Sequence, residues 1–289
     1  MVSKQLVALA FDDEVWAIIG GLDGGRAHVA ELVAAKAWVP VVNAAASDST
    51  IDYANVPWVF RVMPSDAAQA RCLVSRAGTL GYHRLGLVVE GDRDSKVAQK
   101  RIQEAARKAR LSLDFLLEYD PKDPVPAAAR LEGQPIEAFI LWGSQDGAIH
   151  FLKAARSRGV RVPVLACAAL ATPAALAEGD ALGDLTVAAP YDLSRPGDKL
   201  SEFQRRYEAA TGEKPSPIAA LAHDAASVTL EAIRRADLSR ARIRDELSAT
   251  SWTGLTGAVR FDDLGGNPRE PVLLRLQDGK WSPVPADHE

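Results

Sequence analysis

Short apolar runs rich in valine, isoleucine and leucine alternate with segments of helical periodicity almost to the end of the chain. This alternation is typical of parallel sheets whose successive strands are joined by crossover helices. Most of the runs are apolar throughout, as expected for strands that helices cover on both faces. The runs predicted as strands are 15–19, 39–42, 85–89, 113–119, 138–142, 162–166, 185–189, 258–261 and 272–276. The pattern therefore predicts an α/β fold built from doubly wound parallel sheets.

The segments between these runs carry apolar stripes of the kind that pack onto a sheet. Val29, Leu32, Val33 and Ala37 form the first stripe. Further stripes, each with helical spacing, are Ala98, Ile102, Ala105 and Ala109, and Leu221, Ala225, Val228 and Ala232. We therefore expect helices between the strands over most of the chain.

The length and composition of the chain restrict both its architecture and its partners. At 289 residues it exceeds the usual size of one hydrophobic core, so two lobes of ordinary domain size are expected. No apolar run approaches the roughly 20 residues needed to cross a bilayer. The net charge of −4 comes from interspersed acids and bases without a basic stripe, so we expect no nucleic-acid partner.

The loops that follow the predicted strands carry the functional information, because a doubly wound sheet binds ligands at the carboxyl ends of its strands. The first predicted strand is followed by Gly-Gly-Leu-Asp-Gly-Gly at 20–25, and the second by Asn-Ala-Ala-Ala-Ser-Asp at 43–48. Both loops are small and polar, and the first directs a helix N-terminus at any group bound there. The alternative that Gly20 and Gly21 only permit a tight turn stays open.

A dinucleotide cofactor is the competing interpretation of the glycines at 20–25. Their spacing does not fit G-x-G-x-x-G, and the strand at 39–42 ends without the acidic residue that would hold a ribose hydroxyl. We therefore expect no nucleotide cofactor.

The sequence contains no pattern that indicates a disulfide framework, a metal site or a serine nucleophile. Cys72 and Cys167 lie far apart and do not indicate a disulfide framework. The histidines show no metal-ligand spacing with one another or with the cysteines; they are His28, His83, His150, His223 and His288. No G-x-S-x-G motif is present for a serine nucleophile. We expect no metal site, no cofactor and no catalytic activity.

Several ordered segments resemble one protein family. They are VWAIIGGLDG, KAWVPVVNAAASD, PWVFRVMPSD, HDAASVTLEAI, TGAVRFDDLGGNP and DGKW. The chain resembles the leucine/isoleucine/valine-binding family of type I periplasmic binding proteins over nearly its whole length. The resemblance is strong at either end and weak at 120–178.

The resemblance implies two doubly wound lobes joined by three crossings, near 81–84, 189–192 and 268–272. Lobe one would comprise 1–82 plus 191–267, and lobe two 83–190 plus 268–289. A small molecule would be trapped between the lobes by hinge closure and handed to an ABC permease, in the periplasm or another extracytoplasmic space.

For lobe one, the resemblance identifies the residues that would bind the ligand. Gly24 takes the position of a serine that binds the ligand carboxylate, and keeps only the backbone N–H. Ala45 and Ser47 match the alanine and threonine of the same carboxylate site. Asp23 is the only acid that we place at the cleft; it either caps the following helix or meets a cationic or hydroxyl-bearing ligand.

For lobe two, the resemblance places small residues of this chain at positions where family members carry larger polar ones. Ser95 and Ser144 take the places of two tyrosines that face the ligand, and Ala168 takes the place of the acid that holds the ligand's amino group. An ammonium sealed in a cleft without a carboxylate would lose several kcal/mol of hydration. A simple aliphatic amino acid is therefore disfavoured as the ligand.

The start of the chain differs from the family pattern. Family members carry a strand, a helix and a second strand before the segment matching 2–10, and we expect that unit to be missing here. The strand at 15–19 would then have a bare edge in lobe one, which a homodimer could cover. The first residues also fit a signal peptide poorly.

Two alternatives of other classes stay open from the sequence. The first is a cytoplasmic sensor that uses the same fold to regulate a partner protein. The second is a nucleotide-dependent α/β enzyme.

Overall fold

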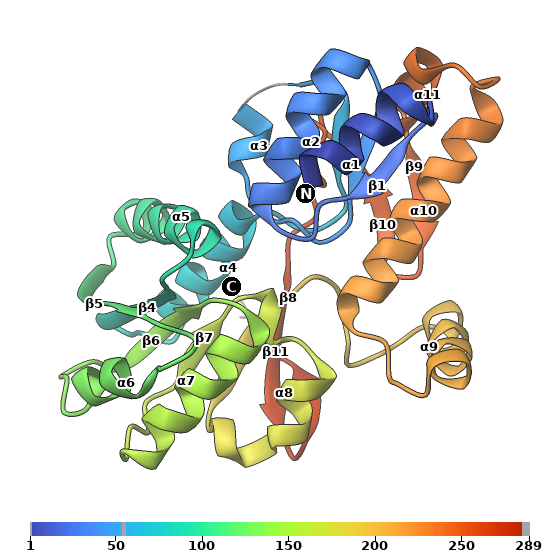
Figure 1. The fold of residues 1–289 in the computed structure, drawn as a ribbon. Coiled ribbons are helices and arrows are strands. Elements are labelled where there is room, and N and C mark those ends of the chain that lie inside the picture. The colour runs from blue at the N-terminus through green and yellow to red at the C-terminus, as the bar shows by residue number, and fades with distance from the viewer. Residues whose placement is uncertain (1, 54–55, 285–289) are drawn as a thin grey trace. The chain divides into compact units, whose positions relative to one another are not determined.

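The computed structural model describes residues 2–53 and 56–284 as an α/β chain that divides into two compact units (Figure 1). Unit 1 consists of Met1–Ser65 and Gly197–Arg269, and unit 2 of Asp66–Pro196 and Glu270–Glu289. The chain therefore passes from one unit to the other three times. Within the described residues, no helix combines the length and the apolar character that a membrane span requires.

Unit 1 is built around a small parallel sheet. In the part of the chain that the structure describes, its three strands have the order β1-β2-β3 and a separate antiparallel hairpin joins β9 to β10. The elements are α1 (Val2–Val7), the π-helix η1 (Ala8–Asp12), β1 (Ile18–Gly20), α2 (Gly24–Ala37), β2 (Val41–Asn43), α3 (Thr50–Tyr53), β3 (Val59–Arg61), α9 (Asp198–Thr211), α10 (Pro217–Arg235), α11 (Arg240–Ser248), β9 (Ser251–Gly254) and β10 (Gly257–Arg260).

Unit 2 is built around a larger mixed sheet. Across the described residues, its strand order is β12-β11-β8-β7-β6-β4-β5, with β8 to β5 parallel and β11 and β12 antiparallel. The elements are α4 (Asp66–Thr79), β4 (Arg84–Glu90), α5 (Arg93–Ala109), β5 (Ser112–Tyr119), α6 (Val125–Leu131), β6 (Ala138–Trp142), α7 (Gln145–Ser157), β7 (Val164–Ala166), the 3-10 helix η2 (Ala168–Leu170), α8 (Pro173–Glu178), the 3-10 helix η3 (Gly179–Leu182), β8 (Leu185–Ala189), β11 (Val272–Gln277) and β12 (Lys280–Pro283).

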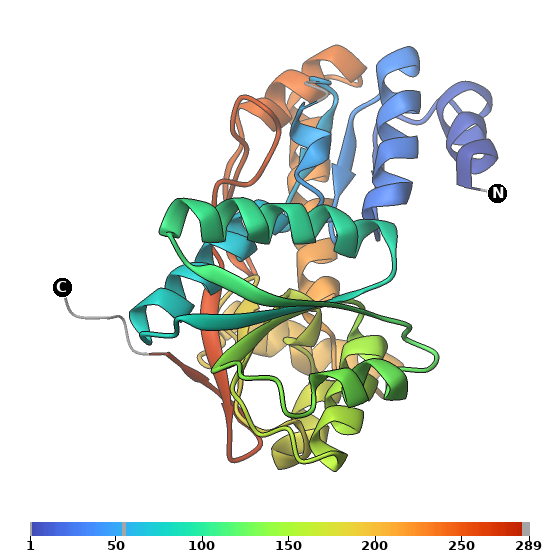
Figure 2. The same ribbon diagram turned by 90° about the vertical axis from the view of Figure 1, so that its left-hand side faces the viewer.

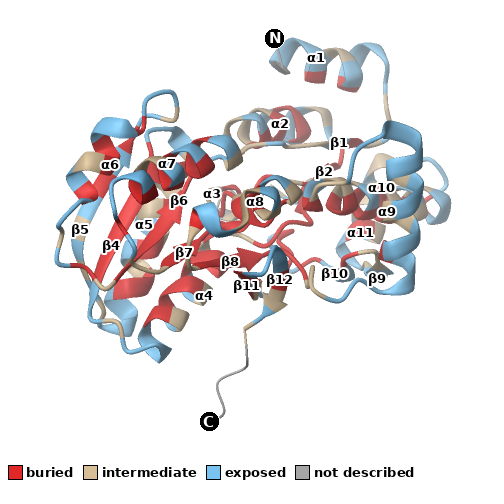
Figure 3. Ribbon diagram, turned by 90° about the horizontal axis from the view of Figure 1, so that it is seen from below, coloured by how far each residue is buried: buried red, intermediate tan, exposed pale blue. Residues whose placement is uncertain are grey.

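Helices cover both faces of the unit 2 sheet, as Figure 2 shows for α5 on one face and α7 on the other. Leu85 and Leu87 of β4 pack with Ile102 of α5, whereas Val88 of the same strand packs with Leu152 of α7. The strands β4, β6, β7 and β8 are accordingly buried in Figure 3. Alternate side chains of each strand thus enter two separate apolar layers, which explains why the sequence runs are apolar throughout.

Helix α2 covers one face of the unit 1 sheet. Ala27 and Ala34 are completely buried and pack with Val41 of β2 and Val59 of β3. Leu32, which the periodicity placed on the buried stripe, is 66% exposed. The packing face of α2 therefore consists of small residues, so the helix can lie close to its sheet.

The α/β fold class predicted from the sequence is confirmed, and many of the predicted strands lie where expected. The ranges 138–142 and 185–189 coincide with β6 and β8. The prediction placed no strand at β3, β9 or β12, each of which has only three or four residues. Each of these strands includes polar or charged residues, so none forms the uninterrupted apolar run that marks most of the others.

The boundaries of the two units differ from those of the expected lobes by a few residues at the second and third crossings and by 17 residues at the first. We expected lobe one to extend to residue 82, but α4 packs on the sheet of unit 2, where Leu73 and Ala77 contact the cluster that contains Leu85 and Ile102. The first crossing accordingly lies between Ser65 and Asp66.

Asp224 provides a test of how unit 1 is held together. This aspartate of α10 is completely buried, and its carboxylate accepts hydrogen bonds from Leu255 N (2.7 Å), Thr256 N (2.9 Å) and Thr256 Oγ1 (2.7 Å) in the β9–β10 turn. Asp224→Ala leaves three donors without an acceptor, so we expect a loss of at least about 3 kcal/mol of stability in urea unfolding. The exposed Asp263→Ala serves as the control, and equal effects of both substitutions would contradict the prediction.

Candidate functional site

The carboxyl ends of β1 and β2 lie side by side in unit 1. Ile18, Ile19 and Gly20 of β1 pair in parallel with the three residues of β2, and the backbone N–H groups of Ala44 and Ala46 donate to the carbonyls of Gly20 (3.1 Å) and Gly21 (2.8 Å). The two loops predicted from the sequence are therefore joined by backbone hydrogen bonds. Gly21 has a φ of 70°, a conformation that favours glycine.

Asp23 has a structural role at the start of α2. Its Oδ1 accepts from Arg26 N at 2.7 Å, and its Oδ2 lies 3.3 Å from Arg26 Nε. This is the helix-capping alternative that the sequence left open for Asp23. Gly24, the next residue, is buried in the first turn of the helix, whose N-terminal end favours negative charge.

Ala45 and Ser47 follow β2 in the same loop and are both half-buried. The Ser47 hydroxyl has no hydrogen-bond partner among residues 2–53 and 56–284. It is therefore available to a bound group. The structure thus brings Gly24, Ala45 and Ser47 to the same edge of the unit 1 sheet.

Asn43, the last residue of β2, was not among the residues predicted for the site. Its side chain is completely buried, and neither Oδ1 nor Nδ2 has a hydrogen-bond partner in the described structure. A Cβ atom at Gly21 would lie only 2.1 Å from Asn43 Oδ1, so the amide occupies the space that this glycine leaves open. An unsatisfied buried polar group costs about 1–3 kcal/mol. The sequence signal was available, because Asn43 is the polar residue that ends an apolar strand.

His28 lies between two acids and holds the loop that follows β2. His28 Nδ1 lies 2.8 Å from Glu31 Oε2, and His28 Nε2 lies 3.2 Å from Asp48 Oδ2 and 2.8 Å from Thr50 Oγ1. Glu31 and Asp48 are both buried. Burial raises the pKa of Glu31 above its ordinary value of 4.5, while the hydrogen bond with His28 acts in the opposite direction. These contacts tie the first turns of α2 to the loop that carries Ser47.

Arg61, the last residue of β3, fixes the other side of the same loop. Its guanidinium is buried, donates to Asp48 O (3.1 Å) and Met63 O (3.2 Å), and makes a bidentate pair with Asp52 at 2.8 and 2.9 Å. Bidentate pairs of this kind hold both partners in a defined orientation. The loop at 43–48 is therefore preorganised by side chains from α2, α3 and β3.

In unit 2, the predicted residue Ser95 lies in the first turn of α5, and Ser144 is the N-cap of α7. Ser95 N and Oγ donate to the carboxylate of Asp92 at 3.0 and 2.6 Å, in the first turn of α5. Ser144 is the N-cap of α7, where its Oγ accepts from Gly147 N at 3.3 Å. Both hydroxyls are therefore already engaged within unit 2.

Ala168, the third residue predicted in unit 2, lies in η2 just after β7. Its backbone N–H donates to Gln69 Oε1 of α4 at 2.9 Å, and the residue is 6% exposed. It contributes only a methyl group at the position where the family resemblance implied an acid.

Glu90, the last residue of β4, is the acid that the sequence analysis missed at this end of the sheet. It is 7% exposed, and its Oε2 accepts from Ser144 N (2.8 Å), Ser144 Oγ (2.7 Å) and Tyr119 Oη (3.4 Å). Burial, and after it the charge of Glu90, raise the pKa of Tyr119, so its hydroxyl stays protonated and donates. Because the apolar run was read as ending at residue 89, the acid directly after it was overlooked.

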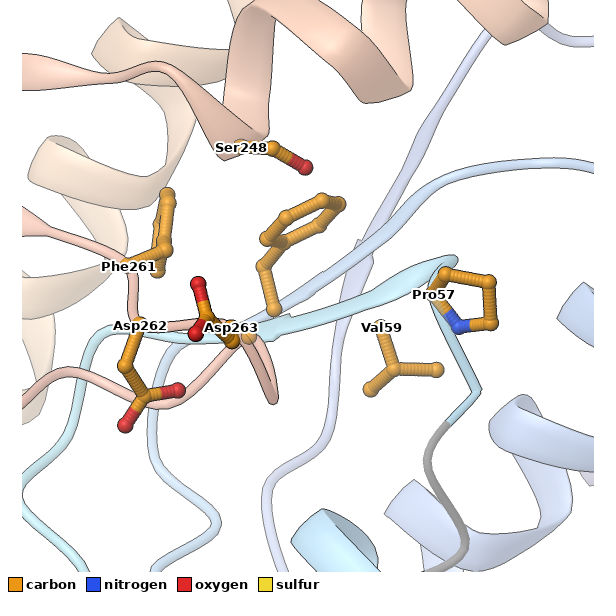
Figure 4. Close-up of a pocket in the computed structure, with 8 residues that line it drawn as sticks. Pro57, Val59, Ser248, Phe261, Asp262 and Asp263 are labelled. Atoms are coloured by element: carbon orange, nitrogen blue, oxygen red, sulfur yellow. The ribbon is translucent and has the colours of Figure 1, made fainter.

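A pocket of about 260 Å³ lies in unit 1 (Figure 4). Its lining includes Pro57 and Val59 at the start of β3 and Asp263 in the turn after β10. The rings of Phe60 and Phe261 pack at 5.0 Å between centroids. The pocket therefore lies at the amino end of β3, whereas the loops described above follow the carboxyl ends of the strands, where doubly wound sheets bind their ligands.

The comparisons with known proteins identify the family. The sequence model of the family described as periplasmic binding protein matches residues 2–279. The chain belongs to the periplasmic binding protein family. No curated protein matches the chain.

Solved structures of this fold cover nearly the whole chain. A leucine-binding protein from Thermotoga maritima has a TM-score of 0.87 at 19% identity, covering 98% of this chain and 83% of that one. A solute-binding protein of an ABC transporter from Rhodopseudomonas palustris, in complex with 3,4-dihydroxybenzoic acid, has a TM-score of 0.88 at 18% identity, with 98% and 81% covered. An ABC transporter substrate-binding protein from Desulfitobacterium hafniense, in complex with leucine, has a TM-score of 0.82 at 23% identity, with 98% and 84% covered.

These findings confirm the predicted family, its α/β fold and the binding function that the family's name states. Periplasmic binding proteins of this kind bind substrates and are not enzymes. The comparisons do not support the alternative regulator or enzyme. The individual ligand residues of this periplasmic binding protein stay predictions.

Asn43 gives a test of whether its unsatisfied amide lowers the stability of the protein. Asn43→Leu replaces an unsatisfied amide by an apolar group of similar shape, so we expect the unfolding free energy in urea to rise by about 1–2 kcal/mol. The matched control is Asn267→Leu in the same unit, because the buried Asn267 amide donates to Val62 O (2.8 Å) and accepts from Arg269 N (3.1 Å). Asn267→Leu should destabilise the protein. If Asn43→Leu destabilises equally, Asn43 is an ordinary structural asparagine.

Proposed function

We propose that the chain binds a small solute that carries a carboxylate and delivers it to an ABC-type importer on the extracytoplasmic side of a membrane. The observation that carries this proposal is the set of unpaired hydrogen-bond groups at the carboxyl ends of β1 and β2. The Ser47 hydroxyl and the Asn43 amide have no partners in the described residues, and the N-terminal end of α2 lies in the adjoining loop. A helix N-terminus together with neutral donors suits a carboxylate better than a cation.

The solved structures of the fold support a carboxylate. Their ligands include leucine, isoleucine, 3,4-dihydroxybenzoic acid and benzoate, all of which carry this group. In this chain, Gly24, Ala45 and Ser47 would hold the carboxylate, and Ser95, Ser144 and Ala168 would line the ligand in the other lobe.

An aliphatic amino acid remains disfavoured within this class. At the position where the resemblance implied the acid for the amino group, Ala168 offers only a methyl group, and its N–H is taken by Gln69. An ammonium has three N–H donors, each of which requires an acceptor when water is excluded. We therefore favour a carboxylic acid without an amino group.

A thermal-shift screen tests this function. Purified protein is heated with benzoate, 3,4-dihydroxybenzoate, 4-methylpentanoate, leucine and, as a matched uncharged compound, benzamide. A ligand at 100 times its dissociation constant stabilises by about 2.7 kcal/mol, so a binder raises the unfolding midpoint clearly. We expect at least one amino-free carboxylate to exceed leucine and benzamide, and Ser47→Ala to reduce that shift. Stabilisation by leucine alone would contradict the ligand class, and no response to any carboxylate would contradict the function.

We propose further that a second copy of the chain covers the free edge of β1. Among the described residues, β1 pairs only with β2. Large apolar side chains are exposed on and around this strand, with Phe11 at 52%, Trp16 at 42%, Ile19 at 45% and Leu22 at 64%. An exposed strand edge with apolar side chains is a surface that proteins usually pair or cover.

The dimer is tested by light scattering on the eluting protein. We expect the mass of a dimer for the unchanged chain and a shift to the monomer for Ile19→Lys, because the charge would be buried in the interface. Leu230→Lys, at a position on α10 that is 60% exposed, is the control and should leave the dimer intact. A monomeric unchanged chain would rule the dimer out.

A further inference from the structure

Glu90 lies at the place in unit 2 where a bound solute is expected. It ends β4, which lies inside the strand order between β6 and β5, and the carboxyl ends of these parallel strands meet at one edge of the sheet. The first turns of α5 and α7 begin just beyond the same edge, at Asp92 and Ser144. Glu90 is thus a buried carboxylate at the ligand end of the sheet.

The two oxygens of the Glu90 carboxylate have different surroundings. Oε2 accepts from Ser144 N, Ser144 Oγ and Tyr119 Oη, whereas Oε1 has no hydrogen-bond partner among residues 2–53 and 56–284. Oε2 is therefore committed to holding the start of α7. Oε1 keeps its full capacity to accept a hydrogen bond.

Neighbouring glycines keep the space around this carboxylate open. A Cβ atom at Gly143 would lie 2.8 Å from Glu90 Oε2 and 2.2 Å from Tyr119 Oη, and one at Gly147 would lie 2.5 Å from Glu90 Oε2. The chain therefore has no side chain at the two positions that would displace the acid. Unlike the amide of Asn43, Oε1 is not a buried unsatisfied atom, so a bound group can reach it.

We infer that Glu90 Oε1 accepts a hydrogen bond from a hydroxyl group of the bound solute, so that the ligand is a hydroxylated carboxylic acid. This inference rests on the function proposed above and specifies its substrate class. A hydroxyl needs one acceptor for its single proton, and Oε1 supplies one. An ammonium would need three acceptors, but Tyr119 Oη is buried, Ser144 Oγ already accepts from Gly147 N, and Ala168 supplies only a methyl group. Glu90, and not the Ser144 hydroxyl, is then the residue of unit 2 that selects the ligand.

Paired probes test this assignment by isothermal titration calorimetry. The pairs are 3,4-dihydroxybenzoate with benzoate, and 2-hydroxy-4-methylpentanoate with 4-methylpentanoate; within each pair only hydroxyl groups differ. A hydrogen bond to a charged acceptor discriminates by roughly 10- to 100-fold, so we expect the unchanged protein to prefer the hydroxylated member of at least one pair by that factor. In Glu90→Gln we expect this ratio to fall to about threefold or less, because the amide oxygen remains with the Ser144 donors and the NH2 group replaces Oε1.

Two control variants distinguish ligand selection by Glu90 from a purely structural role of this residue. Glu118→Gln changes an exposed acid on the neighbouring strand β5 and should leave the ratio unchanged. Tyr119→Phe removes a donor to Oε2 without touching Oε1, so it should lower the unfolding midpoint and retain the preference for the hydroxylated probe. A purely structural Glu90 would show the reverse, with a lower unfolding midpoint in Glu90→Gln and an unchanged ratio.

The outcomes distinguish a failure of the Glu90 assignment from a failure of the proposed function. If carboxylates bind but each pair binds equally, or if Glu90→Gln keeps the preference, the assignment of Glu90 is wrong while the function stands. If no carboxylate of either pair binds, the proposed function fails and the assignment fails with it.

Discussion

The requirement that a parallel sheet be covered on both faces determines where this chain can place polar groups. In unit 2, β4 sends Leu85 and Leu87 into one apolar layer and Val88 into the other, so its side chains from residue 85 to residue 89 are closed to water. The charged side chains of β4 lie at its two ends, and β2 of unit 1 likewise ends in a polar residue, Asn43. Because the parallel strands of one sheet all end at the same edge, the residues that end them gather there within each unit.

The same constraint explains what could be predicted from the sequence. Runs of five largely apolar residues gave β6 and β8 with their observed bounds, because a strand buried on both faces carries few polar residues to obscure it. β3 escaped prediction, since its three residues end in Arg61, a buried guanidinium whose partners come from residues 48, 52 and 63. A single sequence does not show such partners, so a buried arginine looks like a surface residue.

The lobe-one half of the site was more accessible to sequence reasoning than the lobe-two half. In unit 1, Gly24, Ala45 and Ser47 lie within loops that directly follow predicted strands, and the structure brings them to one edge. In unit 2, the Ser95 hydroxyl donates to Asp92, which caps α5, and the Ser144 hydroxyl caps α7 and donates to Glu90. Alignment with a family marks positions; it does not reveal which hydrogen bonds are already satisfied.

Asn43 also shows why polar groups beside a ligand site need not stabilise the empty protein. An asparagine with neither amide atom bonded reduces the stability of the unliganded state. A solute that supplies the missing partners restores this free energy on binding, so its affinity includes the cost carried by the empty protein. Selection for tight and specific capture therefore favours keeping such groups unsatisfied, whereas selection for stability alone would replace them with apolar side chains.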